Sequence, residues 1–180
     1  MTTFGRIRRM LTVLVAGGAV AGGVFAGGAP AQAAVTPFTL SLTAMHSGLV
    51  LAESSNLPGA AVVQTDSDSE LAAAARKWRF DLIAASTARL VNEEFPGLCM
   101  EPEKPNEASI VRMKACSGST AQVWKDHARQ FNGQTVHQWS NLNSHMCLDV
   151  SGASLAPNAL VIQFPCKDGA ANQLFKHTIV

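Results

Sequence analysis

The residues best suited to contact a polar ligand lie close together near the end of the chain, in the stretch Cys147–Phe175. Asp149 offers a carboxylate and Phe164 a flat apolar ring, and Asn172 and Gln173 add primary amides. Together these groups can accept and donate hydrogen bonds and offer a flat apolar surface, a combination suited to a polar ligand with one apolar face.

Two sets of positions recur along the chain with a period near 48 residues. The first set is Val50, Cys99 and Cys147, which are 49 and 48 residues apart. The second set closes each unit and is Trp78, Trp124 and Phe175, which are 46 and 51 residues apart. A period kept at both ends of a unit is an internal repeat. Because each unit contains short strands separated by polar turns, the pattern predicts an all-β barrel or sandwich, closed with pseudo-threefold symmetry.

The third unit begins with a C-x-D sequence at Cys147 and Asp149 and closes on Gln173 and Phe175. This combination resembles one repeat of the ricin-type (R-type) lectin β-trefoil, which is marked by C-x-D near its start and Q-x-W at its end. The resemblance implies an all-β fold, a β-trefoil of three repeats over residues 38–180, in a secreted protein of bacterial type. The repeats would cover about residues 38–86, 87–134 and 135–180.

The resemblance also implies a role for each candidate residue of the third repeat. Asp149 would accept adjacent hydroxyls, Phe164 would stack under the sugar ring, and Asn172 would complete the hydrogen bonding. Gln173 would brace Asp149 from behind, as the glutamine of the Q-x-W motif does in the family. Two alternatives stay open: Asp149 is a turn carboxylate bonded to its own backbone, or Phe164 is a core residue with Gln163 in solvent.

The second repeat keeps Gln122 and Trp124 but has Glu101 in place of the aspartate, Lys114 at the aromatic position and Ala121 at the asparagine position. A carboxylate without a ring to stack on makes half a site at best. The closing residues Trp78, Trp124 and Phe175 are equally explained as members of the trefoil core.

The first repeat has lost more of the pattern. Ala52 stands at the carboxylate position, Thr65 at the aromatic position and Arg76 at the glutamine position. Glu53 is one residue out of register, which turns it to the opposite face of its strand. We expect no sugar site in this repeat.

Residues 1–33 have the order of a secretory signal peptide: three arginines, an apolar run and an A-x-A cleavage signal at Ala31–Ala33. The pair Arg8 and Arg9 leaves twin-arginine export as an alternative. After cleavage, residues 34–37 would form a lead-in, and the mature chain would carry 11 basic and 13 acidic residues, a net charge of −2. Its scattered basic residues do not predict a nucleic-acid partner, and no membrane association is expected after cleavage. We expect a secreted protein.

Four cysteines in an exported chain predict two disulfides. Three connectivities are possible, but the near-equal separations of 17 and 19 residues inside repeated units favour two local pairs. These are Cys99 with Cys116, and Cys147 with Cys166.

The sequence does not predict an enzyme, because it contains no nucleophile elbow and no H-E-x-x-H motif. No cofactor or metal is expected, since the five histidines show no ligand spacing and are interpreted as isolated surface residues. Two hypotheses follow. The first is a secreted carbohydrate-binding protein with one site, in the third repeat, for galactose-like or xylan-type glycans. The second is a trefoil that has lost sugar binding and acts as a protein-interaction or inhibitory module.

Overall fold

The computed structural model describes residues 38–68 and 73–180, and these residues contain twelve β-strands and four short 3-10 helices but no α-helix. The predicted leader and lead-in lie outside the described residues. The strands are β1 (Phe38–Ala44), β2 (Val50–Glu53), β3 (Val62–Thr65), β4 (Trp78–Ala84), β5 (Thr87–Asn92), β6 (Leu98–Pro102), β7 (Ser109–Ala115), β8 (Trp124–Phe131), β9 (Gln134–Asn141), β10 (Cys147–Val150), β11 (Val161–Phe164) and β12 (Phe175–Ile179). The 3-10 helices are η1 (Ala73–Arg76), η2 (Thr120–Gln122), η3 (Ser151–Ala153) and η4 (Ala171–Gln173).

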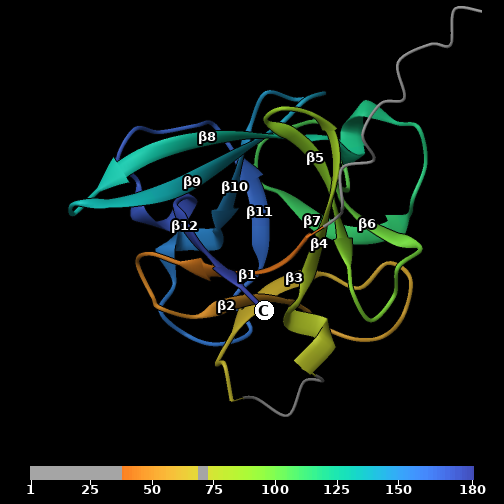
Figure 1. Cartoon of the computed structure of the whole chain (residues 1–180), viewed down its shortest axis with the longest axis horizontal. Coiled ribbons are helices and arrows are strands. Elements are labelled where there is room, and N and C mark those ends of the chain that lie inside the picture. The colour runs from red at the N-terminus through yellow and green to blue at the C-terminus, as the bar shows by residue number, and fades with distance from the viewer. Residues whose placement is uncertain (1–37, 69–72) are drawn as a thin grey trace, which may run out of the picture. The chain divides into compact units, whose positions relative to one another are not determined.

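Six of the strands form a closed barrel (Figure 1). Strand β1 pairs with β4, β4 with β5, β5 with β8, β8 with β9, β9 with β12, and β12 returns to β1, all antiparallel. The other six strands form the hairpins β2–β3, β6–β7 and β10–β11, each joined to the barrel strand that precedes it. Three units of four strands with this pairing make a β-trefoil, which confirms the predicted fold.

The closing aromatic residues of the three repeats meet in one core. Trp78, Trp124 and Phe175 are fully buried in a single hydrophobic cluster. The indole nitrogens of Trp78 and Trp124 donate to the backbone carbonyls of Leu51 and Met100, which are equivalent residues of the first two repeats. Buried indoles need such a partner. These aromatic residues are therefore part of the core.

Both local disulfides are present, Cys99–Cys116 and Cys147–Cys166, as the spacing predicted. Each one joins the first strand of a hairpin to the chain just after its second strand. In the chain-entropy model a loop of this length contributes roughly 3 kcal/mol to the free energy of unfolding.

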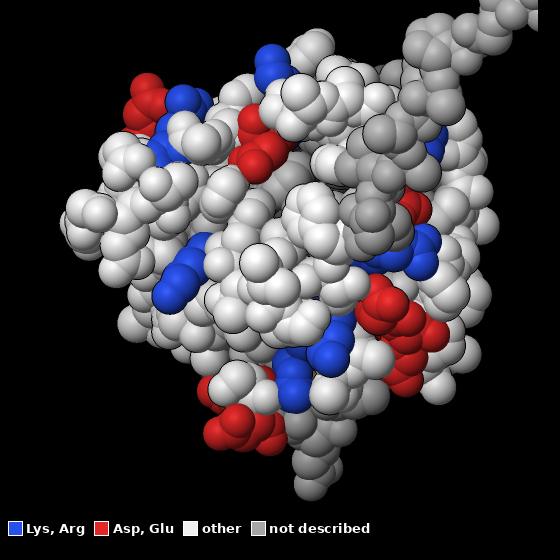
Figure 2. Space-filling model, in the orientation of Figure 1, with Lys and Arg blue, Asp and Glu red and all other residues white. Residues whose placement is uncertain are grey.

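Charges are mixed on the face of the described part that Figure 2 shows, where basic and acidic side chains lie next to one another. Among the described residues, Arg112 forms an ion pair with Glu103 at 3.2 Å and Arg79 forms one with Asp81 at 2.7 Å. In residues 38–68 and 73–180, no helix has the length and apolar composition needed to cross a membrane.

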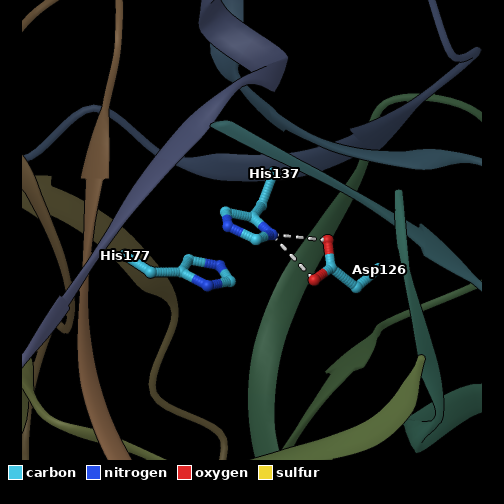
Figure 3. A group of neighbouring side chains, drawn as sticks. All are labelled: Asp126, His137 and His177. Atoms are coloured by element: carbon cyan, nitrogen blue, oxygen red, sulfur yellow. Dashed lines mark hydrogen bonds and ion pairs between the residues drawn. The ribbon is translucent and has the colours of Figure 1, made fainter. Parts of the chain in front are cut away.

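The expectation of isolated surface histidines is wrong for His137 and His177 (Figure 3). Their rings stack with centroids 3.5 Å apart and planes inclined by 8°. His137 Nδ1 lies 2.8 Å from the carboxylate of Asp126, and the Trp139 indole donates to His177 Nε2 at 3.2 Å. Burial, and then the neighbouring His137, lower the pKa of His177 to about 4.

Asp126, His137 and His177 have ligand-type atoms within 4.8 Å of one another. Imidazole lone pairs lie in the plane of the ring, so two parallel stacked rings do not direct them at one point. His177 Nε2 is also already engaged by Trp139. We therefore interpret this group as a packing and hydrogen-bonding cluster and assign no metal to it.

Candidate functional site

A surface pocket of about 480 Å³ lies on the third repeat and is bordered by Ala108 of the second. The antiparallel register of β10 and β11 sets Cys147 opposite Phe164 and Asp149 opposite Ile162. The end of the chain brings Asn172, on η4, to the same place. The pocket is lined by Ala108, Asp149, Ser151, Gly152, Ala153, Ile162, Phe164, Lys167 and Asn172. Three of the four predicted site residues thus share one pocket, and the fourth, Gln173, lies behind it.

The carboxylate of Asp149 is held by two side-chain amides. Asn172 Nδ2 donates to Oδ1 and Gln173 Nε2 donates to Oδ2, both at 2.9 Å. The side chain is only 5% exposed, so burial raises the pKa of Asp149, while the hydrogen bonds from Gln173 and Asn172 act in the opposite direction. Each carboxylate oxygen has a second lone pair, which leaves capacity to accept a hydroxyl. These partners do not match the alternative of a turn carboxylate bonded to its own backbone.

Gln173 is fully buried and connects four groups. Besides Asp149, its Nε2 donates to the Pro165 carbonyl at 3.0 Å. Its Oε1 accepts from the Lys167 backbone N–H at 2.8 Å and from Gln138 Nε2 at 3.1 Å. All of its hydrogen-bonding capacity is used inside the protein. The geometry is that of a brace behind Asp149 rather than of a ligand contact.

Phe164 is partly exposed and lines the pocket, whereas its neighbour Gln163 is fully buried. Gln163 Nε2 donates to the carbonyls of Lys104 and Asn106 at 2.8 and 2.7 Å, and its Oε1 accepts from Ser144. The alternative that placed Phe164 in the core and Gln163 in solvent is therefore wrong. An apolar ring thus lies at the pocket beside a hydrogen-bonding carboxylate.

Lys167 is a pocket residue that the sequence reasoning missed. Its ammonium lies 5.1 Å from the centroid of the Phe164 ring, a distance typical of a cation–π contact. The residue follows Cys166 directly and belongs to neither the C-x-D nor the Q-x-W motif. The sequence offers one signal for it. Lys167 is a positive charge directly after Cys166, and the third repeat is the one with an aromatic residue, Phe164, two positions before that cysteine.

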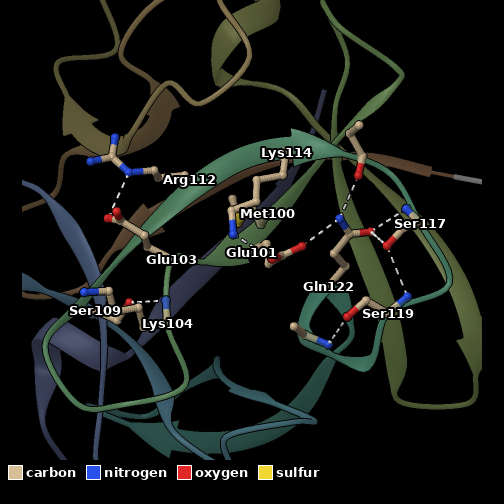
Figure 4. Close-up of polar contacts among 12 residues, drawn as sticks. Met100, Glu101, Glu103, Lys104, Ser109, Arg112, Lys114, Ser117, Ser119 and Gln122 are labelled. Atoms are coloured by element: carbon tan, nitrogen blue, oxygen red, sulfur yellow. Dashed lines mark hydrogen bonds and ion pairs between the residues drawn. The ribbon is translucent and has the colours of Figure 1, made fainter.

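In the second repeat an ion pair occupies the corresponding place (Figure 4). Lys114 is paired with Cys99 across the hairpin, as Phe164 is with Cys147. The Lys114 ammonium lies 2.7 Å from Glu101, and Gln122 Nε2 donates to the same carboxylate at 2.9 Å. Glu101 is thus neutralised by the residue that stands where a ring would be needed.

The first repeat has neither group. Thr65 is buried opposite Val50, and Ala52 is fully buried. Glu53 is 1% exposed, and burial, followed by the charge of Glu94, raises its pKa to about 7. Among the described residues, neither oxygen of the Glu53 carboxyl has a hydrogen-bond partner. This carboxyl is enclosed and has no access to a ligand.

The three units of four strands make the fold a β-trefoil, and a family match gives its class. The model of the ricin-type β-trefoil lectin domain family matches residues 38–175. The chain belongs to this family, which indicates carbohydrate binding in general rather than catalysis. No curated protein sequence shows a significant match to the chain.

Solved structures agree with the fold. The chain is similar to the designed threefold-symmetric protein ThreeFoil, with 25% identity and a TM-score of 0.69 over 79% of this chain and 99% of that one. It is similar to a Macrolepiota procera ricin B-like lectin solved with lactose, with 13% identity and a TM-score of 0.62 over 79% and 95% of the two chains. It also matches a Clostridium thermocellum exo-β-1,3-galactanase, with 20% identity and a TM-score of 0.69 over 79% of this chain. It spans only 30% of that enzyme.

Proposed function

We propose that this protein is a secreted, non-catalytic carbohydrate-binding protein whose single sugar site is the third-repeat pocket. The observation that carries the proposal is the Asp149 carboxylate, fixed by two amides at the edge of an open pocket and set beside the partly exposed ring of Phe164. This arrangement supplies a hydroxyl acceptor and a flat apolar surface in one place. Asn172 adds a carbonyl oxygen, because both of its described hydrogen bonds use the amide nitrogen.

Galactose-like sugars are the first ligands to test, with xylan-type glycans second. Lactose, a galactoside, was bound to the similar Macrolepiota lectin. Binding to one shallow site of this kind would have a Kd near millimolar, about −4 kcal/mol. Avidity on a densely repeating glycan would offset this weak affinity.

The test is a titration of the ¹⁵N-labelled protein with lactose and with xylo-oligosaccharides, followed by NMR. The wild type should show shifts around Asp149, and Asp149→Asn should lose them, because an amide cannot accept two hydroxyls as the carboxylate does. Glu101→Gln is the matched control in the second repeat and should bind like the wild type. If a broad glycan array and these titrations show no binding by the wild type, the proposal is wrong and a protein-interaction module becomes the better hypothesis.

A further inference from the structure

The backbone of Lys167 is held by the side chains of two glutamines. Its N–H donates to Gln173 Oε1 at 2.8 Å, and its carbonyl accepts from Gln138 Nε2 at 3.1 Å. The second repeat uses the same anchor, where the Ser117 N–H donates to Gln122 Oε1 at 2.6 Å. The glutamine of the closing motif therefore fixes the backbone of the residue that follows the second cysteine. This residue is a cation in the third repeat and a serine in the second.

The side chain of Lys167 turns toward the pocket. Its ammonium contacts the Phe164 ring at 5.1 Å from the centroid, and among the described residues no carboxylate forms an ion pair with it. Burial raises the pKa of Asp149, and the charge of Lys167 acts against that rise. Lys167 and Asp149 are the two charged side chains that line the pocket.

The Lys167 ammonium over the Phe164 ring should affect the binding of neutral and anionic sugars in opposite ways. A neutral sugar that stacks on Phe164 competes with the ammonium for the ring, and loss of the cation–π contact lowers its affinity by about two- to five-fold. A sugar with an anionic substituent keeps the ammonium close and pairs with it through a charge-assisted hydrogen bond. Asp149 opposes this preference by like-charge repulsion, so the preference requires the anionic group to lie nearer the Lys167 ammonium than the Asp149 carboxylate.

We propose that the pocket selects pyranosides that carry one anionic group, either the carboxylate of a uronic acid or a sulfate ester, and that Lys167 is the residue that determines this specificity. The proposal rests on the sugar site proposed above and names its ligand class.

The experiment compares methyl β-galactopyranoside with methyl galactopyranosiduronate and with galactose 6-sulfate by NMR titration. In 20 mM salt we expect at least one anionic sugar to bind about five-fold more tightly than the neutral one, the size of an exposed charge pair. The ratio should shrink in 300 mM salt because exposed charges are screened. The two anionic sugars separate carboxylate from sulfate recognition, and a preference for either supports the proposal.

Two variants test whether the charge of Lys167 causes the preference for anionic sugars. Lys167→Ala should abolish the preference and bind the neutral sugar as well as the wild type or about two- to five-fold better, since the ring is uncovered. Lys167→Arg keeps the charge and should keep the preference. A variant that is unfolded or generally weakened would lose binding of both the neutral and the anionic sugars. The ratio of the two affinities in the wild type would then decide whether the proposal holds.

Equal wild-type affinity for neutral and anionic sugars overturns this inference but leaves the sugar site standing. An anionic preference that survives in a folded Lys167→Ala variant also overturns it. Absence of binding by any sugar overturns the sugar site itself, and this inference with it.

Discussion

Replacing Glu53 by glutamine is expected to stabilise the protein at pH 8 and to change its stability little at pH 4.5. Glu53 ends strand β2, is 1% exposed and has no hydrogen-bond partner among the described residues. The equivalent residues of the other repeats, Pro102 and Val150, are buried and apolar. The core therefore has a place for an apolar side chain here and holds a carboxyl group instead.

The magnitude follows from the pKa of Glu53, which burial raises from 4.5 to about 7. Between these values the folded protein keeps a proton that the unfolded chain releases, so the free energy of unfolding falls as the pH rises. The pKa shift corresponds to a contribution of about 3 kcal/mol to the free energy of unfolding. This contribution is fully present below pH 4.5 and is lost by pH 8. Glutamine cannot ionise and escapes this loss.

Urea unfolding followed by tryptophan fluorescence measures the effect, since Trp78, Trp124 and Trp139 are all buried. The stability of the variant minus that of the wild type should rise from near zero at pH 4.5 to about 3 kcal/mol at pH 8. Glu107→Gln, on an exposed loop, is the matched control and should follow the wild-type profile. A difference for Glu53→Gln that does not change with pH would refute the reasoning.

Three further predictions concern the brace, the second repeat and the histidine stack. Gln173→Ala should lose roughly 2–4 kcal/mol of stability, because buried groups lose their hydrogen bonds, and should weaken sugar binding because Asp149 is no longer held. Urea unfolding and lactose titration check both effects, and unchanged values would contradict the bracing role. Lys114→Phe combined with Ala121→Asn should create a second site, raising the number of sugars bound from one to two in a saturating titration; a count of one would show that more than these groups is needed. The folded pKa of His177, about 4, predicts that stability falls as the pH drops from 6.5 through 4, by at most about 3 kcal/mol. His177→Gln should lack this fall in the same urea assay, and an unchanged acid profile would contradict it.

The fold could be predicted from the sequence because the repeat is marked at both ends. Cysteines and closing aromatics recur near the same period, and each repeat folds into the same four strands. The orientation of Phe164 could not be settled in this way. Strand β11 has four residues and is buried on both faces up to Gln163, so alternation does not identify an exposed side.

The histidine stack and Lys167 were missed for different reasons. His137 and His177 are 40 positions apart and meet only because β12 pairs with β9 when the barrel closes. Lys167 is close in sequence to the site residues, but a lysine has no motif of its own, and its contact with Phe164 depends on the path of the chain after Cys166. Both features are consequences of tertiary structure rather than of local pattern.

The glutamine of the closing motif is a poor indicator of sugar binding in this fold. Gln122 binds the Ser117 N–H and the Ala115 carbonyl, and Gln173 binds the Lys167 N–H and the Pro165 carbonyl. Each glutamine thus closes the same backbone turn whether or not its repeat has a complete site, and loss of these buried bonds would cost stability in either case.

In the two disulfide-bonded hairpins, the residue opposite the first cysteine distinguishes the repeat with the proposed sugar site from the repeat without one. It is Phe164 in the third repeat, where the ring faces a pocket, and Lys114 in the second, where the ammonium neutralises Glu101. Both side chains are partly exposed and lie outside the core cluster, so this position can vary without disturbing the trefoil core. A ring there, together with a carboxylate two residues after the first cysteine, is the pattern on which the sugar site proposed for the third repeat depends.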